Sequence, residues 1–149
     1  MRKTSILLRI LCSLIDLLVL LVPVQLIVLG VFGVQPVQAS YLFLLLWAVY
    51  GTLCCEITGG MTLGKYCGKM CVLDRDGTKP SLMYLGLREL TKAMYLQPLA
   101  GPVLMIISLG MYLVRGVTLH DLIGRTRVVY LGQAKRIRAE QEAQYERER

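Results

Sequence analysis

The sequence predicts an all-α membrane protein: two long transmembrane helices plus a shorter helical hairpin, with a small two-stranded cytoplasmic β element and a charged C-terminal tail. Three observations lead to this fold class. Hydrophobic residues make up 55% of the 149 residues, and the mean hydropathy of +0.56 is too high for a soluble domain of this length. Residues 10–64 contain no lysine or arginine. The basic residues lie instead in clusters, which mark the cytoplasmic side of a membrane protein.

Two apolar stretches, residues 5–29 and 41–58, are each suited to crossing a hydrocarbon layer of about 30 Å, which takes about 20 helical residues. Residues 30–40 form the outward connection between them, and Gly59-Gly60 ends the second stretch. The chain begins as a secretory signal peptide does, but the length of the first stretch and the Asp16 within it favour an uncleaved span. We therefore expect both termini on the cytoplasmic side.

Residues 61–81 carry too many charges to lie in lipid. We expect a strand at residues 70–73, a turn at 74–77, and a second strand at 125–131 that pairs with the first. The turn resembles the start of a calcium-binding loop but lacks the later ligands. Thr62-Leu63-Gly64-Lys65 lacks the spacing of a phosphate-binding loop. We expect Gly64 to let the chain turn out of the membrane, and give little weight to Gly64-x3-Gly68 as a helix-packing pattern.

Residues 82–113 allow more than one topology. Pro98 and Pro102 predict a break at residues 97–102, with helices at 82–96 and 103–113. These helices would be about 22 Å and 16 Å long, so a re-entrant or interfacial hairpin is favoured over two full spans. A single span over residues 93–114 is the alternative, but it would place the later basic residues outside. Residues 1–131 then form the transmembrane domain, and residues 132–149 form a charged cytoplasmic tail, either helical or disordered.

Charged residues within the apolar segments are the strongest functional signal. Arg9 and Asp16 are the only charges between Ile6 and Cys55, and they are seven residues apart. Seven residues are two helical turns, about 10.5 Å, so both lie on one face of a helix. A charge at the centre of a span costs about 2.5–3.5 kcal/mol or more. A partner charge, a water-filled cavity or a substrate path must therefore accompany them. The candidate path residues are Arg9, Asp16, Glu56, Arg88, Glu89 and Asp121.

Two interpretations of these residues remain open. In the first, Asp16 takes up and releases a proton or a small cation, Arg9 tunes its affinity, and Asp121 with Arg88 forms an inner gate. In the second, the charges only lock the fold. Arg9 then extends to the headgroups, and Glu56 lies at the inner interface. Because Arg88 and Glu89 are adjacent, they should point in different directions and need partners elsewhere.

Other functional classes have little support in the sequence. Basic loops with interleaved aromatic residues, as nucleic-acid binding requires, are not found. Cys67-x3-Cys71 has no second ligand pair, so we expect no metal, and we expect the cysteines to serve in packing. His120-Asp121 is the one suggestive acid–base pair, but adjacent residues seldom work as one. We therefore expect neither a cofactor nor an enzymatic activity.

The order of these residues resembles the RDD family of bacterial membrane proteins, named for one arginine and two aspartates. Arg9, Asp16 and Asp121 resemble the family's three residues. Thr62-Leu63-Gly64-Lys65, the turn at residues 72–77 and the pair Arg88-Glu89 match further positions, so the resemblance extends from Arg9 to Val129. Cys67 and Cys71 stand where aliphatic residues would be expected. The resemblance implies a helical domain in the bacterial cytoplasmic membrane and a role in transport, with cation/proton exchange proposed for some members.

Two functions are therefore kept. The first is a small transporter or transporter subunit that self-associates, since 149 residues are few for an autonomous carrier. The second is a non-transporting membrane adaptor that assembles a membrane or cytoplasmic partner on its charged cytoplasmic segments. The behaviour of Asp16 distinguishes the two functions, because proton-coupled transport requires Asp16 to take up and release a proton and an adaptor does not.

Overall fold

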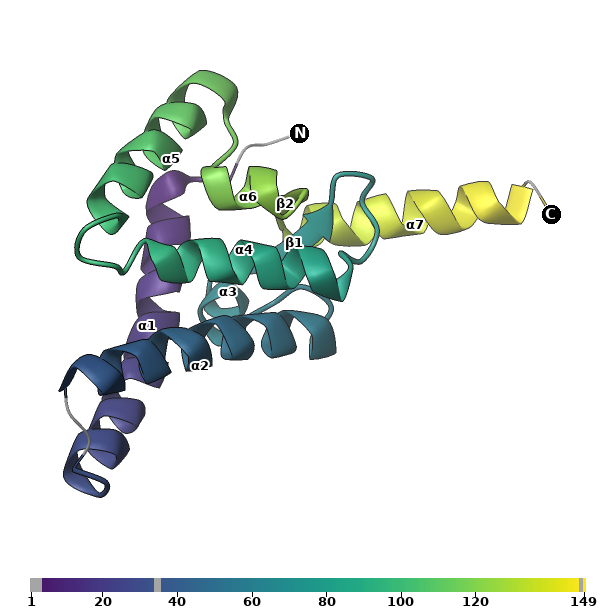
Figure 1. Ribbon diagram of the computed structural model, residues 1–149. Coiled ribbons are helices and arrows are strands. Elements are labelled where there is room, and N and C mark those ends of the chain that lie inside the picture. Colours follow the sequence, from purple (N-terminus) through teal and green to yellow (C-terminus); the bar gives the residue numbers. More distant parts are fainter. Residues whose placement is uncertain (1–3, 34–35, 148) are drawn as a thin grey trace.

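The computed structural model describes residues 4–33, 36–147 and 149, so the basic pair Arg2-Lys3, and residues 34–35 of the connection, lie outside the described residues. The described chain is mostly helical with one small sheet (Figure 1). Its elements, in order, are α1 (Ile6–Gly30), α2 (Pro36–Ile57), α3 (Leu63–Cys67), β1 (Met70–Asp74), α4 (Leu82–Met94), α5 (Gly101–Arg115), α6 (Leu119–Ile123), β2 (Thr126–Tyr130) and α7 (Leu131–Arg147).

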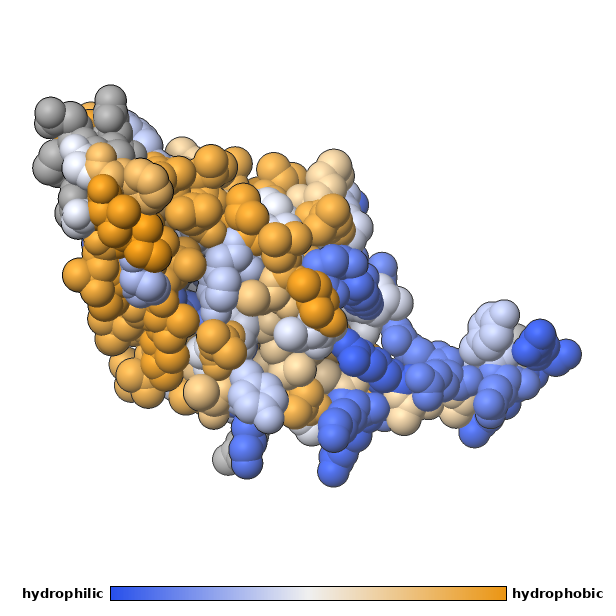
Figure 2. Space-filling model, turned by 90° about the horizontal axis from the view of Figure 1, so that it is seen from below, coloured by the Kyte–Doolittle hydropathy of each residue, from blue (hydrophilic) through white to orange (hydrophobic). Residues whose placement is uncertain are grey.

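The two predicted spans are confirmed as long apolar helices. Ile6–Val28 within α1 and Ser40–Ile57 within α2 have the length and hydropathy needed to cross a membrane. Large apolar side chains along both helices face outward, which is the expected arrangement for lipid contact. Figure 2 shows the result: hydrophobic surface covers one end of the molecule, and hydrophilic residues gather at the other. This distribution supports an integral membrane protein.

The chain breaks between α4 and α5, as the prolines predict. α4 ends at Met94, turns follow, and α5 begins at Gly101 with Pro102 in its first turn. A single span over this region is therefore wrong. The two helices diverge, however, instead of lying side by side as a hairpin would (Figure 1). α4 packs mainly on α2 and α6. The buried face that makes these contacts carries Arg88 and Glu89.

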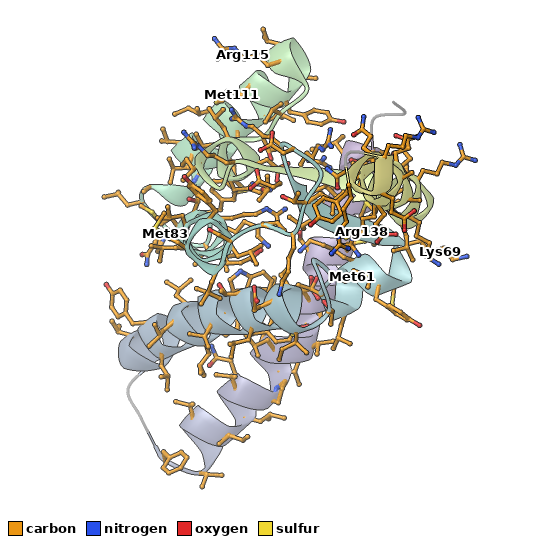
Figure 3. The ribbon with its side chains drawn as sticks, turned by 90° about the vertical axis from the view of Figure 1, so that its right-hand side faces the viewer. Met61, Lys69, Met83, Met111, Arg115 and Arg138 are labelled. Carbon is orange, nitrogen blue, oxygen red and sulfur yellow. The ribbon has the colours of Figure 1, made fainter. Side chains whose placement is uncertain are left out.

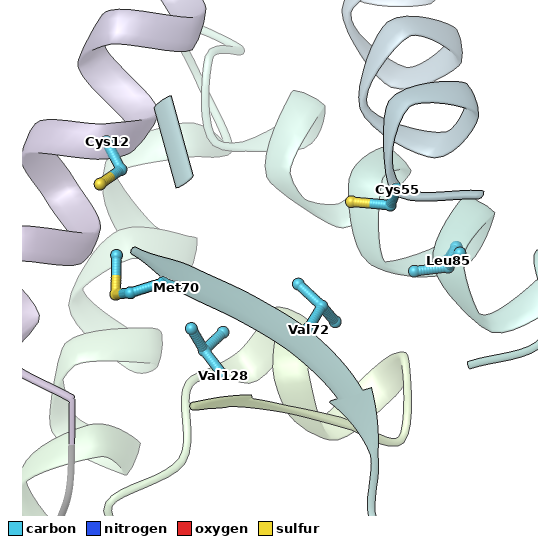
Figure 4. Close-up of a cluster of buried hydrophobic side chains, with 6 residues drawn as sticks. All are labelled: Cys12, Cys55, Met70, Val72, Leu85 and Val128. Atoms are coloured by element: carbon cyan, nitrogen blue, oxygen red, sulfur yellow. The ribbon is translucent and has the colours of Figure 1, made fainter. Parts of the chain in front are cut away.

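β1 and β2 pair in antiparallel register, from Met70 opposite Tyr130 to Asp74 opposite Thr126. This confirms the predicted sheet. Successive side chains of a strand alternate between its faces, and both faces are covered here. One face joins α1, α2 and α4 in the core cluster of Figure 4, made of Cys12, Cys55, Met70, Val72, Leu85 and Val128. The buried Cys12 and Cys55 thus serve in packing.

The other face of the sheet is covered by the start of α7. Ala134 is buried there against Cys71 and Leu73, and Ile137 packs beside them. The tail is therefore helical, and its first turns belong to the folded unit, whereas later residues extend away from it (Figure 1). Arg138 of α7 donates to the Gly59 carbonyl at 3.1 Å, near Met61 (Figure 3). This contact ties α7 to the turn at the end of α2.

Candidate functional site

Asp121 is the centre of a buried charge network. It lies on α6, is 2% exposed, and binds two arginines from different helices. Its Oδ2 accepts from Arg9 of α1 at 2.7 Å, and its Oδ1 accepts from Arg88 of α4 at 3.1 Å. Arg9 also donates to Thr4 Oγ1 at 2.8 Å and to the Val128 carbonyl at 3.3 Å. One carboxylate thereby joins α1, α4 and α6.

The network continues along α4. Arg88 donates to Glu89 at 3.2 Å, and the other oxygen of Glu89 is paired with Lys92. The expectation that Arg88 and Glu89 point apart is therefore wrong: long side chains bend together when both are buried. Burial alone would raise the pKa of Glu89, but Lys92, Lys65 and Arg88 outweigh it and hold that pKa at about 2. Glu89 is thus charged at neutral pH.

Gly51 of α2 makes room for this carboxylate. A Cβ at that position would lie 2.5 Å from Glu89 Oε2, closer than a carbon and an oxygen can approach. The absence of a side chain lets α4 bring its acidic residue against the second span. This small residue carried no signal in the sequence, because its role appears only once α2 and α4 are packed.

Asp16 lies in a separate site. It is 4% exposed, and three neutral groups donate to it. Thr62 Oγ1 lies 2.5 Å from Oδ2, while the Gly64 amide and the Tyr50 hydroxyl lie 2.8 Å and 3.3 Å from Oδ1. We predicted Arg9 as the residue that tunes Asp16, but Arg9 pairs with Asp121. The rise of two turns that places both residues on one helix face also holds them too far apart for direct contact.

α3 supplies the Gly64 amide that donates to Asp16 of α1, and two glycines let α3 approach α1 closely. A Cβ on Gly64 would lie 1.9 Å from the Cys12 carbonyl oxygen, and one on Gly68 would lie 2.5 Å from Cys12 Sγ. The Gly64-x3-Gly68 pattern therefore does pack against a helix, contrary to our expectation. The basic neighbours do not prevent this packing, since Lys69 is exposed and the glycine edge faces α1, although Lys65 is buried.

Glu56 does not join either site. Its carboxylate is paired with Lys79 near the surface, and both side chains are at least one-third exposed. The prediction that Glu56 lies along the path at the depth of Asp16 is not supported by this position. It lies near the end of α2, which brings it to the loop before α4 instead of the interior. An exposed pair of this kind contributes about 0–1 kcal/mol to stability.

His120, beside Asp121, belongs to a polar chain that sequence reasoning did not assemble. Its Nδ1 lies 3.3 Å from the Tyr95 hydroxyl, which donates to Ser108 Oγ at 3.2 Å, and its Nε2 lies 3.2 Å from Thr118 Oγ1. Burial lowers the pKa of His120 to about 3, although Asp121 opposes the shift. The imidazole is therefore neutral at physiological pH. No spacing rule connects residues 95, 108 and 120, which come from three segments.

A cavity of about 450 Å³ lies beside the network, between α1, α4 and α5. Arg9, Arg88 and His120 border it at one end, and Leu14, Leu17 and other apolar residues border it elsewhere. Its volume is within the range of small-molecule sites, about 300–1,000 Å³. The buried charged side chains therefore border an open cavity on one side and are not enclosed by protein atoms on every side.

The model of the RDD family matches residues 3–125 of this sequence, which is most of its length. The chain belongs to the RDD family. The matched range contains Arg9, Asp16 and Asp121, which resemble the family's arginine and two aspartates, and it ends before β2 and α7. Comparisons with curated proteins and with solved structures return no match. In this RDD protein, Arg9 and Asp121 are bonded to each other, whereas Asp16 forms its own site with α3.

Proposed function

We propose that this RDD protein is a membrane transport protein or a transporter subunit, and that Asp16 is the group that takes up and releases a proton. The position of Asp16 carries the proposal. It is a carboxylate buried within a membrane span, and among the described residues its three hydrogen bonds come from the neutral donors Tyr50, Thr62 and Gly64. A carboxylate in this setting can change its charge without breaking an ion pair.

The surroundings of Asp16 support access to a proton. Ser13 and Leu17, its neighbours on α1, border the cavity, as does Lys65 of α3. Water in the cavity would bring a proton within a turn of the carboxylate. The charge network of Asp121, Arg88 and Arg9 would hold the helices around it, with Asp121 and Arg88 as the inner gate. We propose cation/proton exchange as the form of transport, which the family resemblance implies, and assign the chain no enzymatic reaction.

The experiment is flux in vesicles containing the purified full chain. A pH-sensitive dye inside the vesicles reports proton movement when Na⁺ or K⁺ is added outside. Asp16→Asn keeps an acceptor for the Gly64 amide but cannot titrate, so we expect flux to fall to that of protein-free vesicles. Asp76→Asn makes the same chemical change in an exposed turn and should leave flux intact. Unchanged flux in Asp16→Asn, with the variant folded, would remove Asp16 from the mechanism.

The alternative function is a non-transporting adaptor, and the completeness of the Asp121 network favours it. Both oxygens of Asp121 and both of Glu89 have cationic partners, as a structural lock requires. The charged α7 and the α3–β1 segment would then form the partner surface. Co-purification of a partner in fixed stoichiometry, together with an inactive wild type in the flux assay, would establish the adaptor instead.

We further propose that the protein resides in the bacterial cytoplasmic membrane with both termini in the cytoplasm, and that it forms homo-oligomers. The exposed apolar side chains of α1, α2 and α5 support contact with lipid and with further copies. Cross-linking in native membranes at increasing dilution into lipid tests self-association. Monomers at every dilution would exclude it.

A further inference from the structure

The cavity between α1, α4 and α5 has both polar and apolar side chains in its buried lining, and apolar side chains where it opens. Its exposed lining residues include Ile10 and Leu14 of α1 and Met105 and Leu109 of α5, which are 47–58% exposed. Its buried lining residues include Arg88, Lys65, Ser108 and Thr118, each at most 6% exposed. Because the opening is lined by the side chains that face lipid, the cavity opens toward the membrane interior. Its lining matches a molecule with a polar head and an apolar chain.

The charges on the cavity wall have one sign. Arg9, Lys65, Arg88 and Lys92 border the cavity, whereas the carboxylates of Asp16, Glu89 and Asp121 do not. Among the described residues, four cationic groups border the space. Arg9, Arg88 and Lys92 are each paired with Asp121 or Glu89 behind them, and in the described part of the chain Lys65 has no carboxylate within ion-pair distance. This arrangement attracts an anion and repels a small cation. The cavity is thus not a route for the cation of the proposed exchange.

Two wall groups have hydrogen-bonding capacity left over. The Lys65 ammonium is buried, and the one hydrogen-bond partner given for it in the described part of the chain is the Cys55 thiol, at 3.8 Å. The indole N–H of Trp47 is also buried and has no acceptor among the described residues. A buried donor without an acceptor is costly, about 1–3 kcal/mol for a neutral group and more for a charged one. An occupant with anionic oxygens would satisfy Lys65.

We propose that this cavity binds an anionic membrane lipid, with its phosphate head at Lys65, Arg9 and Lys92 and one acyl chain along the apolar side chains of α1 and α5. Basic pockets between membrane helices are a recurring form of site for anionic lipid heads. The bilayer supplies the ligand through the apolar opening, so no aqueous entrance is needed. The same cavity borders Ser13 and Leu17 beside Asp16, so a bound lipid head would share it with the water proposed to reach Asp16. Lipid binding itself does not depend on exchange.

Trp47 provides the measurement, because it is the only tryptophan of the chain and it borders the cavity. The full-length protein is reconstituted into phosphatidylcholine vesicles that contain a minor fraction of phosphatidylglycerol with brominated acyl chains. Bromine quenches indole fluorescence on contact. We expect stronger quenching than with the same fraction of brominated phosphatidylcholine, because the buried indole borders the cavity. Equal quenching by the two lipids overturns the proposal.

Variants separate the site from general surface attraction. Lys65→Met removes the charge while keeping a long side chain, and we expect about tenfold weaker binding of the brominated anionic lipid, since a charge-assisted hydrogen bond is lost. Lys135→Met makes the same change on the exposed face of α7 and should bind as the wild type does. Equal effects of the two variants would show surface attraction alone and contradict the site.

A second variant protects the test if Lys65→Met fails to fold. Ser13→Leu places an apolar side chain on the cavity wall within a span, and we expect it to lower quenching by occupying space, with the charges intact. Unaltered quenching in that variant contradicts the proposal. Inorganic phosphate tests for a free anion as the ligand. Complete competition by phosphate at concentrations comparable to the lipid would show that the acyl chain contributes nothing to the binding affinity, and would reject a lipid site.

Discussion

Asp121 is shared by two arginines from different helices, and this sharing explains why a short helix of five residues matters to the whole fold. Arg9 and Arg88 use separate oxygens of the carboxylate, so neither arginine can be moved without affecting the other. Burial alone would raise the pKa of Asp121, but His120 and the two arginines lower it far below its usual value. The carboxylate is therefore charged at every physiological pH and acts as a fixed structural anion.

Replacing this carboxylate should be costly. In Asp121→Asn, the buried Arg88 and the partly buried Arg9 lose their shared anion, and breaking a buried pair in this way costs about 3–5 kcal/mol. Glu56→Gln is the matched change at the exposed pair with Lys79, and it should cost no more than about 1 kcal/mol. Chemical unfolding of both variants in detergent measures the difference. Similar free energies of unfolding would show that the network does not lock the fold.

His120 should make stability depend on pH above the range in which carboxylates titrate. Its folded pKa of about 3 lies below the unfolded value, so the unfolded state binds the proton more readily and stability falls as the pH drops below about 6.5. Between pH 7 and pH 5 the loss should be about 2 kcal/mol. Burial causes the shift, Asp121 and Glu89 oppose it, and Arg88 and Lys92 add to it.

The measurement is the free energy of unfolding as a function of pH in detergent. His120 is the only histidine, so His120→Gln should flatten the curve between pH 5 and 7 even if it lowers stability overall. A curve that keeps its slope in the variant would assign the pH dependence to other groups.

At the scale of elements, α3 is the piece that completes the Asp16 site. Thr62, which caps the N-terminus of α3, donates to Asp16, and its hydroxyl oxygen accepts from the Lys65 amide at 3.5 Å. A helix of five residues has little stability alone, so its position depends on docking against α1. The missing side chain of Gly64 permits that docking.

Gly64→Ala should therefore separate α3 from α1. The added methyl would overlap the Cys12 carbonyl, and overpacking of this kind costs about 1–3 kcal/mol. Gly86→Ala is the matched control on α4, where a Cβ meets nothing within 4 Å; alanine there should stabilise the helix by about 0.5–1 kcal/mol. Thermal unfolding compares them. A Gly64→Ala variant as stable as the control would contradict the close approach.

The elements that sequence reasoning placed correctly are those that depend on local composition. The spans follow from runs of apolar residues, the break before α5 from two prolines, and the strands from short apolar runs beside turn residues. The pairing of Arg9 with Asp121 could not be placed in this way, because 112 residues separate them. The close approach of Gly64 to Cys12 depends equally on tertiary packing.

At the scale of the whole molecule, charge and hydropathy are separated along its length. Exposed large apolar side chains lie on α1, α2 and α5, while α7 and the turn at residues 74–77 carry exposed charges. Figure 2 shows hydrophobic surface at one end of the molecule and hydrophilic surface at the other. This separation fixes how the protein can enter a bilayer, since exposed charges cannot lie in hydrocarbon. Our proposal that the charged segments lie on the cytoplasmic side rests on the basic residues they carry.

The native cysteines test this orientation. Cys67 on α3 is exposed, whereas Cys12, Cys55 and Cys71 are buried and Cys54 lies partly buried within the second span. A membrane-impermeant maleimide should therefore label mainly Cys67, and only in inside-out vesicles, where the cytoplasmic surface faces the reagent. Cys67→Ser should abolish that label and identifies its source. Labelling of Cys67 in right-side-out vesicles would reverse the orientation, because the one exposed thiol of the described chain reports the side of the membrane on which α3 lies.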